Sequence, residues 1–546
     1  MPNARTMNLE KSNEWFYFGI ACLAAIIVML PIAVWGIPSG TDVAQHFQFA
    51  ETYHDALLNG DGFPGWSAKE NFGYGGIGIR FYPPLAYYVL AFARILAGNW
   101  FDAAWLTFTF WMIVGCTGVY FWARWWFSPK ESAIAAVFYA VIPYHLIQLY
   151  MSFMYADFAG SAILPFCFAF LTRIASREKK SDVLGLATAY ALLILTHLPT
   201  TITGSICLAI YALILLHKGR MLRQIFKSSI GIGLGLAASA FYWFRMVREM
   251  TWLNHATDKY TSGHYNFANW FFPISFHAVA DDQKENFIVP DVMCVLCVLF
   301  LVSAIVYLFY RKTAGAETDR VARVFRTVLP LGSLAFFMLT PLSLPLWRIL
   351  PFLEKIQFPM RWMSVVAMCG AIVAAASVHF TLKGNFLKQR TWAYISVIFP
   401  VVILLFNGVY IWNPGAFMPM DRVRFEAEMR ELPEKQNLMF WWSIWSKPSA
   451  LEVKEKVLAE NRETAITDWR AEERSFTTAT GAATKARIAT FYYPRWRATV
   501  NDQSVNIEQD ENGVMLIPLP AEKSTVKIFF QEPVGIRIAS IFSIIA

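Results

Sequence analysis

The chain has 546 residues, of which 56% are hydrophobic and only 16% are charged. Apolar runs of about 20 residues recur along it, which excludes a soluble multi-domain protein and predicts several membrane spans. The formal net charge of +8 does not indicate a nucleic-acid partner, because the basic residues gather in short loops between the apolar runs.

About eleven apolar segments have the length and composition of transmembrane helices. The first one follows a tail of mixed charge and lacks a small-residue cleavage site, so we expect a retained anchor and not a signal peptide. The predicted spans are residues 15–35, 103–126, 131–149, 158–176, 182–196, 200–216, 228–245, 289–310, 326–343, 363–382 and 392–412.

Clusters of basic residues predict which face of the membrane each loop occupies. The clusters fall in every second loop, so they share one face, and an excess of Lys and Arg marks that face as cytoplasmic. The loops that carry Asp42, Asp157, His197 and Arg361 are then extracytoplasmic. The clusters lie within residues 173–180, 218–227, 311–326 and 383–390.

The assignment of loops to the two membrane faces also determines how residues 81–96 are interpreted. If this segment crossed the membrane, Asp42 and Asp157 would lie on opposite faces. The segment is short, opens with two prolines and contains Arg94. We therefore expect an interfacial or re-entrant helix that returns to the outer face.

The composition changes after the last predicted span. We expect residues 1–412 to form the membrane domain, with the outer loop 36–102 carrying the site. In residues 413–535 the charge rises, and alternating segments after a helical lead-in predict a small antiparallel β domain outside the cytoplasm. Residues 536–546 are apolar but too short to span, so they form either a docked tail or the start of a further span.

The outer loop contains the first candidate site. Asp42 and His46 are four residues apart and follow Thr41, so a helix capped by Thr41 would put both side chains on one face. Such a pair can bind a metal or act as a base with its partner. A solvated first helical turn, with Asp42 favoured by the helix dipole, explains the same residues.

Two more polar residues adjoin apolar spans. Asp157 begins a span and has no basic neighbour in sequence, and an idle carboxylate at membrane depth is costly, which favours a functional role over a helix cap. His197 follows a span and precedes Pro199. A single histidine in this position is more often a hydrogen-bonded interfacial residue than a catalyst.

Gln357 and Arg361 stand at the outer mouth of a predicted span. The planar guanidinium of Arg361 suits a lipid phosphate or diphosphate. The alternative is an arginine that snorkels beside an aromatic belt.

In order along the chain, these residues resemble a known family, the bacterial multi-spanning membrane proteins named 6-pyruvoyl-tetrahydropterin-synthase-related. That name implies no pterin chemistry here, and the family belongs to the wider GT-C superfamily of lipid-linked-sugar glycosyltransferases. Asp157 stands where a glutamate is expected, and Met360 where an aromatic residue is usual. The matching motifs are GTD (40–42) with His46, NFGYG (71–75), FYPPL (81–85), Tyr150, ADF (156–158), TH (196–197), QFPMR (357–361) and YPRW (493–496).

The resemblance implies a GT-C fold in a bacterial inner membrane. It also implies transfer of a sugar from a polyprenyl-phosphate donor to a glycan, lipid or protein acceptor at the outer face. Asp42, Asp157 and His46 are the catalytic candidates, with Asp42 as the base. No cofactor is required by the sequence, and a divalent metal at Asp42 and Asp157 is left open. The substrate-binding candidates are Arg361 and, second, Arg80 for the leaving phosphate, together with Tyr82, His197, Gln357 and Tyr150.

Two other classes of protein share these features. A transporter or flippase of lipid-linked saccharides would also have basic cytoplasmic loops and buried carboxylates, but its broken helices would come in paired halves, and the sequence shows no such symmetry. A non-catalytic envelope assembly protein would use the β domain to bind a glycan or another protein.

Overall fold

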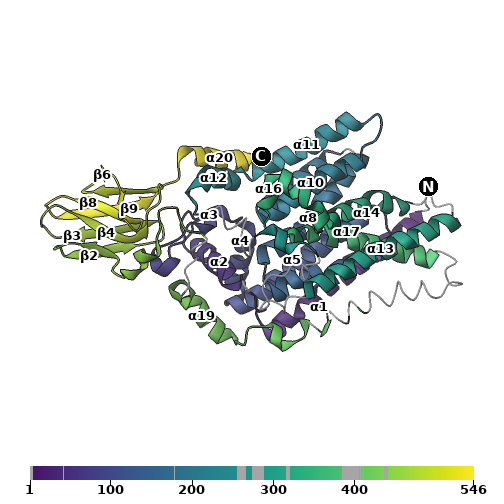
Figure 1. Cartoon of the computed structure of the whole chain (residues 1–546), viewed down its shortest axis with the longest axis horizontal. Helices are drawn as coiled ribbons and strands as arrows, with labels where there is room; N and C mark the ends of the chain where they lie inside the picture. The colour runs from purple at the N-terminus through teal and green to yellow at the C-terminus, as the bar shows by residue number, and fades with distance from the viewer. Residues whose placement is uncertain are drawn as a thin grey trace. The chain divides into compact units, whose positions relative to one another are not determined.

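The computed structural model describes residues 4–40, 42–177, 179–254, 266–272, 288–314, 320–383, 411–435 and 441–545, together with residues 402, 405, 408 and 409 (Figure 1). The chain divides into two compact units, each built from separate stretches of sequence. Unit 1 comprises Met1–Asp42, Ala104–Ala237 and Thr257–Pro419, and unit 2 comprises Val43–Ala103, Ala238–Ala256 and Met420–Ala546.

Unit 1 consists of helices (Figure 1). One of them, α5, begins a few residues earlier, in unit 2. The longer helices are α1 (Ala4–Trp35), α5 (Trp100–Ala123), α6 (Pro129–Val141), α8 (Tyr155–Arg177), α9 (Lys180–Ile194), α10 (Leu198–Ile214), α11 (Met221–Ala238), α13 (Ile288–Ala314), α14 (Ala322–Phe337) and α17 (Met363–Lys383). The shorter ones are α7 (Pro143–Leu146), η2 (Ile147–Met151), η6 (Phe267–Trp270), η10 (Pro341–Ser343), α15 (Leu344–Ile349), α16 (Pro351–Glu354), η11 (Pro359–Trp362) and η13 (Pro414–Ala416).

Among the described residues, four helices are long and apolar enough to cross a membrane, and the number rises to seven if each of three bent helix pairs is one span. The mostly helical architecture is therefore confirmed, whereas the count of about eleven spans is not. The last predicted span, 392–412, lies almost entirely outside the described residues. The four are Asn13–Trp35, Trp100–Ala123, Tyr155–Arg177 and Pro359–Thr381.

Local sequence explains why some of these helices begin and end where they do. Ser128 and Glu131 form a capping box at the start of α6, and Pro129 occupies the first turn, where a missing N–H costs nothing. Because Pro143 has no N–H and disfavours helical geometry in the residue before it, α6 ends at Val141.

Helix α17 lies at the centre of unit 1, with nearly all of its apolar stretch buried. It packs against α6, α8, α13 and α14. Small residues such as Ala367, Gly370 and Ala374 let neighbouring backbones approach closely, which is how helices associate inside a membrane.

Unit 2 combines helices from three stretches of the chain with the C-terminal strands. Helix α4 has 13 residues and is therefore about 20 Å long, which is shorter than a hydrocarbon core of about 30 Å. This length agrees with the predicted interfacial helix, and the face on which it lies stays a prediction. The helices are α2 (Val43–Leu58), η1 (Asn71–Gly73), α3 (Gly78–Phe81), α4 (Leu85–Ala97), α12 (Ala240–Glu249), η3 (Met250–Trp252), α19 (Arg422–Lys435), η15 (Pro448–Glu452) and α20 (Val534–Ile545).

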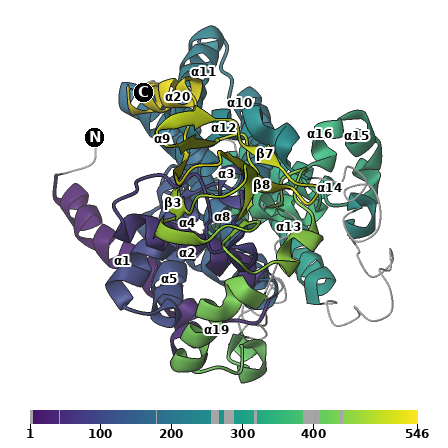
Figure 2. The same ribbon diagram turned by 90° about the vertical axis from the view of Figure 1, so that its left-hand side faces the viewer.

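The strands form two antiparallel sheets, with the orders β1-β4-β8-β7 and β2-β3-β9-β5-β6. Figure 2 turns this region toward the viewer, with β3, β7 and β8 labelled. Buried and exposed residues alternate along β9, and Phe476, Ile488, Ile517 and Val526 are fully buried in the core of this region. The C-terminal β-rich region predicted from this alternation is confirmed. The strands are β1 (Val457–Ala459), β2 (Thr464–Trp469), β3 (Glu473–Thr478), β4 (Thr484–Phe491), β5 (Trp496–Val500), β6 (Gln503–Val505), β7 (Glu508–Gln509), β8 (Val514–Leu519) and β9 (Ser524–Phe530).

The NFGYG motif joins residues 43–103 to this β-rich region within unit 2. Trp442 Nε1 donates a hydrogen bond to Asn71 Oδ1 at 2.9 Å, and the backbone N–H of Phe491 donates to the carbonyl of Tyr74 at 3.0 Å. Gly75 has a left-handed φ of 82° and lies directly against the indole nitrogen of Trp66. The glycine is therefore required both by its backbone conformation and by the lack of space for a Cβ.

The packing of Gly75 leads to a stability prediction. Gly75→Ala should lower the stability of the protein by about 2 kcal/mol or more, because the new Cβ adds a clash with Trp66 to backbone strain. Gly73→Ala is the matched control, since Gly73 has a similar φ of 86° but open space beside it, so only about 1 kcal/mol of strain is expected. Thermal unfolding of the purified variants measures the difference, and equal losses would contradict the proposed clash.

Candidate functional site

Asp157 is the centre of a buried polar cluster in unit 1. It lies in the first turn of α8 and is 3% exposed. Tyr144 donates to its Oδ2 at 3.2 Å, and Thr200 donates to its Oδ1 at 2.6 Å. His197 Nδ1 lies 3.3 Å from Oδ1 and 2.8 Å from the Thr200 hydroxyl. The carboxylate is therefore held by three groups from two segments of the chain, which offsets the cost of burying a charge.

The start of α10 brings two of these partners to Asp157. His197 has extended backbone geometry at the residue before the helix, Pro199 occupies the first turn, and Thr200 follows one position later. Gly160 lies one turn after Asp157 on α8, and a Cβ there would be 3.0 Å from His197 Cβ. The small residue thus allows α8 and the start of α10 to pack closely enough for the hydrogen bonds to form.

Arg361 adds a positive charge beside this cluster. It lies in η11, which packs against α10, and its charge acts on Asp157 and His197, although no hydrogen bond joins them. Its Nη1 donates to the carbonyl of Ile356 and lies 3.4 Å from Gln357 Oε1. Its Nε has no hydrogen-bond partner among the described residues. Arg361 therefore keeps donor capacity next to a buried carboxylate.

The segment before α8 has unusual backbone geometry. After the short helix α7 the chain makes a π-helical turn, η2, and Phe153 then adopts a left-handed φ of 53°. His145 Nδ1 lies 3.0 Å from Gln148 Oε1, and Gln148 donates to Ser161 on α8 at 3.2 Å. Such π-helical turns and left-handed residues are concentrated at functional sites, because the surrounding contacts must stabilise them.

Gly40, two residues before Asp42, lies against this segment. A Cβ on Gly40 would be 2.5 Å from Phe153 Cβ, so the two backbones are in close contact. Tyr150 donates its hydroxyl to the carbonyl of Val28 at 2.7 Å, which ties η2 to α1. Gly40 is two residues from Asp42, and Phe153 is four residues from Asp157. This contact supports the expectation that the two carboxylates are neighbours, and their separation stays a prediction.

In unit 2, the structure brings His46 and Tyr82 together in an aromatic cluster. His46 is buried in α2, and its Nδ1 lies 2.7 Å from the hydroxyl of Tyr87. The ring of Tyr82 lies 6.1 Å from that of His46 and 5.5 Å from that of Trp441, both edge to face. The helical spacing that placed Asp42 and His46 on one face depends on Thr41, which lies outside the described residues.

Arg80 has different surroundings from the other substrate-binding candidates. Its side chain is fully buried in unit 2, where Nε and Nη2 bind both oxygens of Glu249 at 2.7 and 2.9 Å. Nη1 binds Glu532 at 2.6 Å, and Tyr493 and Arg495 each donate to Glu249 at 2.7 Å. These contacts favour a structural role, because they occupy the donors that a phosphate would need.

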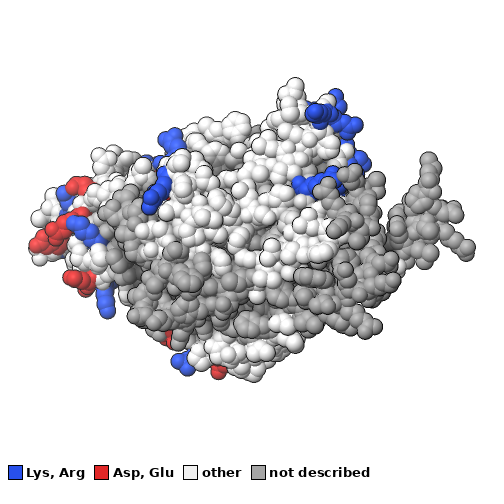
Figure 3. All heavy atoms as spheres, turned by 45° about the vertical axis from the view of Figure 1, so that its right-hand side comes forward, with Lys and Arg blue, Asp and Glu red and all other residues white. Residues whose placement is uncertain are grey.

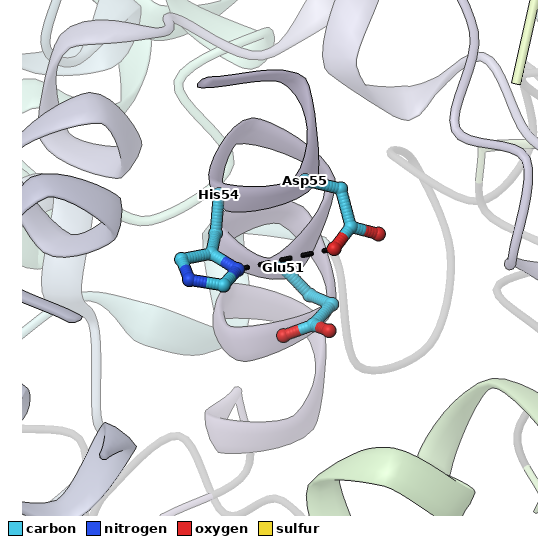
Figure 4. A group of neighbouring side chains, drawn as sticks. All are labelled: Glu51, His54 and Asp55. Atoms are coloured by element: carbon cyan, nitrogen blue, oxygen red, sulfur yellow. Dashed lines mark ion pairs between the residues drawn. The ribbon is translucent and has the colours of Figure 1, made fainter. Parts of the chain in front are cut away.

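One group of side chains on α2 has the composition of a metal site (Figure 4). Glu51, His54 and Asp55 lie together on one side of the helix and are partly exposed. The ammonium of Lys69 lies 2.6 Å from Asp55 and 3.1 Å from Glu51. Burial would raise the pKa of Asp55, but the neighbouring His54 and Lys69 lower it below its usual value. Lys69 thus already supplies the cationic partner of this group.

Glu70, directly before the NFGYG motif, is a buried carboxyl that the sequence did not single out. It is 2% exposed, and neither of its side-chain oxygens has a hydrogen-bond partner among the described residues. Gly76 lies so close that a Cβ would overlap one of these oxygens. Burial raises the pKa of Glu70 to about 7, because the charged form loses its hydration.

The sequence found part of the cluster around Asp157 but missed several of its members. Asp157, His197, Gln357 and Arg361 come together, as a shared site requires. The missed residues are hydroxyl and amide groups within apolar segments, which are too common in membrane helices to stand out. One available signal was the spacing of His145 and Gln148 after a proline. The members that the sequence missed are Tyr144, His145, Gln148, Ser161 and Thr200.

The long apolar helices and the buried charged cluster define a polytopic membrane protein with a polar site at one end of its helices. The chain belongs to the family described as the 6-pyruvoyl-tetrahydropterin synthase related domain, a membrane protein family whose sequence profile matches residues 79–414. The family inferred from the motifs is therefore confirmed. No curated protein matches the chain in sequence.

Three solved structures of glycosyltransferases resemble the fold. Arabinofuranosyltransferase AftD from Mycobacteria aligns with a TM-score of 0.48 and 13% identity over 74% of this chain, but over only 27% of AftD. ArnT from Cupriavidus metallidurans, bound to undecaprenyl phosphate, aligns with a TM-score of 0.35 and 14% identity over 74% of this chain and 90% of ArnT. The apo oligosaccharyltransferase of Archaeoglobus fulgidus aligns with a TM-score of 0.38 and 13% identity over 74% of this chain and 55% of its own length.

The raised pKa of Glu70 predicts a pH-dependent stability. Between about pH 4.5 and pH 7 the unfolded chain has lost this proton and the folded chain keeps it, so stability should fall as the pH rises through that window, by roughly 1–3 kcal/mol. Glu70→Gln should lack this component and be more stable than the unsubstituted protein at pH 8. Thermal unfolding at pH 5 and pH 8 measures it, with the exposed Glu511→Gln as control. An unchanged pH dependence in Glu70→Gln would contradict the assignment.

Proposed function

We propose that this protein is a membrane glycosyltransferase that moves a sugar from a polyprenyl-phosphate donor to a glycan, lipid or protein acceptor at the extracytoplasmic face. The observation that carries the proposal is the cluster around Asp157, where a buried carboxylate and an arginine with free donor capacity meet. The order of motifs in the sequence supports the same reaction class, and the contact between Gly40 and Phe153 supports the addition of Asp42 to the site.

The reaction needs a base for the acceptor, and we assign this role to Asp42. Asp42 is partly exposed. In the proposed step the acceptor oxygen attacks the anomeric carbon of the sugar while the bond from that carbon to the phosphate oxygen breaks. Asp42 takes the hydroxyl proton, and the polyprenyl phosphate leaves with the bonding electrons.

Asp157 has contacts that suit an orienting residue better than a base. Tyr144, Thr200 and His197 all contact its oxygens, so the carboxylate is fixed in direction. A group held in this way can position neighbouring groups with little reorganisation during the reaction. His197 is proposed to orient a substrate, because Asp157 and Thr200 both contact its Nδ1 and so fix the position of the ring.

Arg361 is the first candidate for binding the leaving phosphate. A phosphate ester that departs as an anion needs positive charge nearby, and a guanidinium offers two parallel donors to its oxygens. Gln357 has a left-handed φ of 67° just before η11, and its Oε1 accepts from Arg361 Nη1 at 3.4 Å. Arg80 stays the second candidate, although its donors already bind Glu249 and Glu532.

The donor set is compatible with a divalent metal. Asp42 and Asp157 would hold it, and Mg²⁺ commonly binds one or two carboxylates together with water and substrate phosphate oxygens. A bound metal would neutralise charge on the phosphate. The steps assigned above to Asp42, Asp157 and Arg361 hold with or without it.

Release of polyprenyl phosphate from a panel of polyprenyl-phosphate sugars tests the proposal on the purified full chain. Asp42→Asn keeps the size of the side chain but removes the base, so release should fall by about 10²–10⁴-fold with little change in melting temperature. Asp61→Asn, an exposed carboxylate in the same loop, should leave activity unchanged. Asp157→Asn should reduce release less if it only orients, and comparably if it binds a metal. Full activity in Asp42→Asn would remove Asp42 from the mechanism.

Donor binding tests the role of Arg361 separately. Arg361→Ala should weaken binding of the lipid phosphate donor by about tenfold or more, because a charge-assisted pair is lost, and Arg361→Lys should restore only part of it. Arg348→Ala, an exposed arginine in the preceding helix α15, is the control. Unchanged donor affinity in Arg361→Ala would remove Arg361 from the donor site.

A transporter of lipid-linked saccharides is the second candidate function. The three bent helix pairs are the observation in its favour, because broken helices form the substrate sites of many transporters. Reconstituted protein that moves the donor across a vesicle membrane without releasing polyprenyl phosphate would support the transporter and contradict the enzyme.

A further inference from the structure

A second charged cluster lies at the end of α8 remote from Asp157. Twenty residues separate Asp157 from Arg177 on this helix, which corresponds to about 30 Å at 1.5 Å per residue. That length equals the thickness of a hydrocarbon core. Arg173 and Arg177 therefore lie at the membrane face opposite the site around Asp157.

Three arginines at this face stack on aromatic rings. The guanidinium carbon of Arg173 lies 3.6 Å from the centre of the Phe121 ring on α5. Arg177 and Arg320 both lie over Trp125, at 5.1 and 5.2 Å from its centre. Arg320 comes from the residues just before α14, so the ends of α5 and α8 and the start of α14 meet here. Stacking fixes the guanidinium planes and leaves their edges available as donors.

The cluster has more positive than negative charge. Partial burial lowers the pKa of Arg320, and the charges of Arg124, Arg323 and Arg177 lower it further. These four arginines are thus close enough to repel one another.

The neighbouring carboxylates do not balance this charge. Among the described residues, Glu14 pairs with Arg124 at 3.0 Å, and Asp182 acts on Arg173 from beyond ion-pair distance. Within the part of the chain that the structure describes, five arginines face two carboxylates, which leaves an excess of three positive charges there (five minus two). Figure 3 shows one face of the molecule, on which Lys and Arg atoms form blue patches at the upper right.

We propose that this arginine cluster, formed by Arg124, Arg173, Arg177, Arg320 and Arg323, binds the phosphate of an anionic phospholipid in the adjacent leaflet. The guanidinium edges match phosphate oxygens, and basic pockets between membrane helices bind anionic headgroups. The cluster lies at the level expected for lipid headgroups, because its arginines surround a tryptophan at the ends of membrane-length helices. The site is distinct from the donor site, from which the length of α8 separates it.

Titration of the purified full chain with phosphatidylglycerol or phosphatidylcholine, with bound lipid counted by native mass spectrometry, tests this proposal. Phosphatidylglycerol should bind at least about tenfold more tightly than phosphatidylcholine, which has no net charge. The double variant Arg177→Ala/Arg320→Ala should lose at least about tenfold in phosphatidylglycerol affinity. Arg177→Gln/Arg320→Gln, which keeps most of the stem, should show the same loss and provides the test if the alanine variant does not fold.

The matched control is Lys130→Ala/Lys218→Ala, which removes two exposed positive charges from neighbouring loops and should leave phosphatidylglycerol affinity within about twofold. Equal binding of the two lipids, or unchanged phosphatidylglycerol binding in both arginine variants, would overturn the proposal. Competition by inorganic phosphate at millimolar concentration would also overturn it, because the cluster would then be a site for a free anion. Displacement of the lipid by an acidic protein would overturn it as well.

Discussion

A carboxylate at the start of a buried helix has to be neutralised or hydrogen-bonded by its surroundings, and the arrangement of unit 1 near Asp157 follows from this requirement. Tyr144 from α7 and Thr200 from α10 each donate to it, and His197 lies against the same oxygen as Thr200. Gly160 provides the space for α10 to pack against α8. The π-helical turn η2 connects the segment that carries Tyr144 to α8. Removal of these donors would leave a charge in an apolar bundle, at a cost of several kcal/mol.

The same requirement acts in unit 2, where the buried charges bind one another and hold segments of the chain together. Glu249 is fully buried and accepts hydrogen bonds from Arg80, Tyr493 and Arg495, while Arg80 also binds Glu532. Every donor of Arg80 is used, in contrast to Arg361, whose Nε has no partner among the described residues. The difference separates an arginine that holds segments of chain together from one that can accept a ligand.

Charge and periodicity allowed part of this architecture to be predicted from the sequence. The alternation after Glu463 gave the strands, because side chains on a strand point to opposite faces. The cost of an unpaired carboxylate identified Asp157. The partners of Arg80 could not be predicted, since Glu249 and Glu532 are 169 and 452 positions away and look like ordinary surface glutamates in sequence. The number of spans was not confirmed, because bends divide three helix pairs and a hydropathy pattern does not register a bend.

The long separation between Arg80 and Glu532 has a consequence for the biogenesis of the protein. Arg80 is synthesised 452 residues before Glu532, and at about 5–20 residues per second this interval lasts roughly 20–90 s. Throughout that time residues 43–103 have left the ribosome without the strands and the carboxylate that complete unit 2. The order of synthesis therefore leaves a partly assembled segment beside the membrane, where chaperones or proteases that survey newly inserted chains have time to act on it.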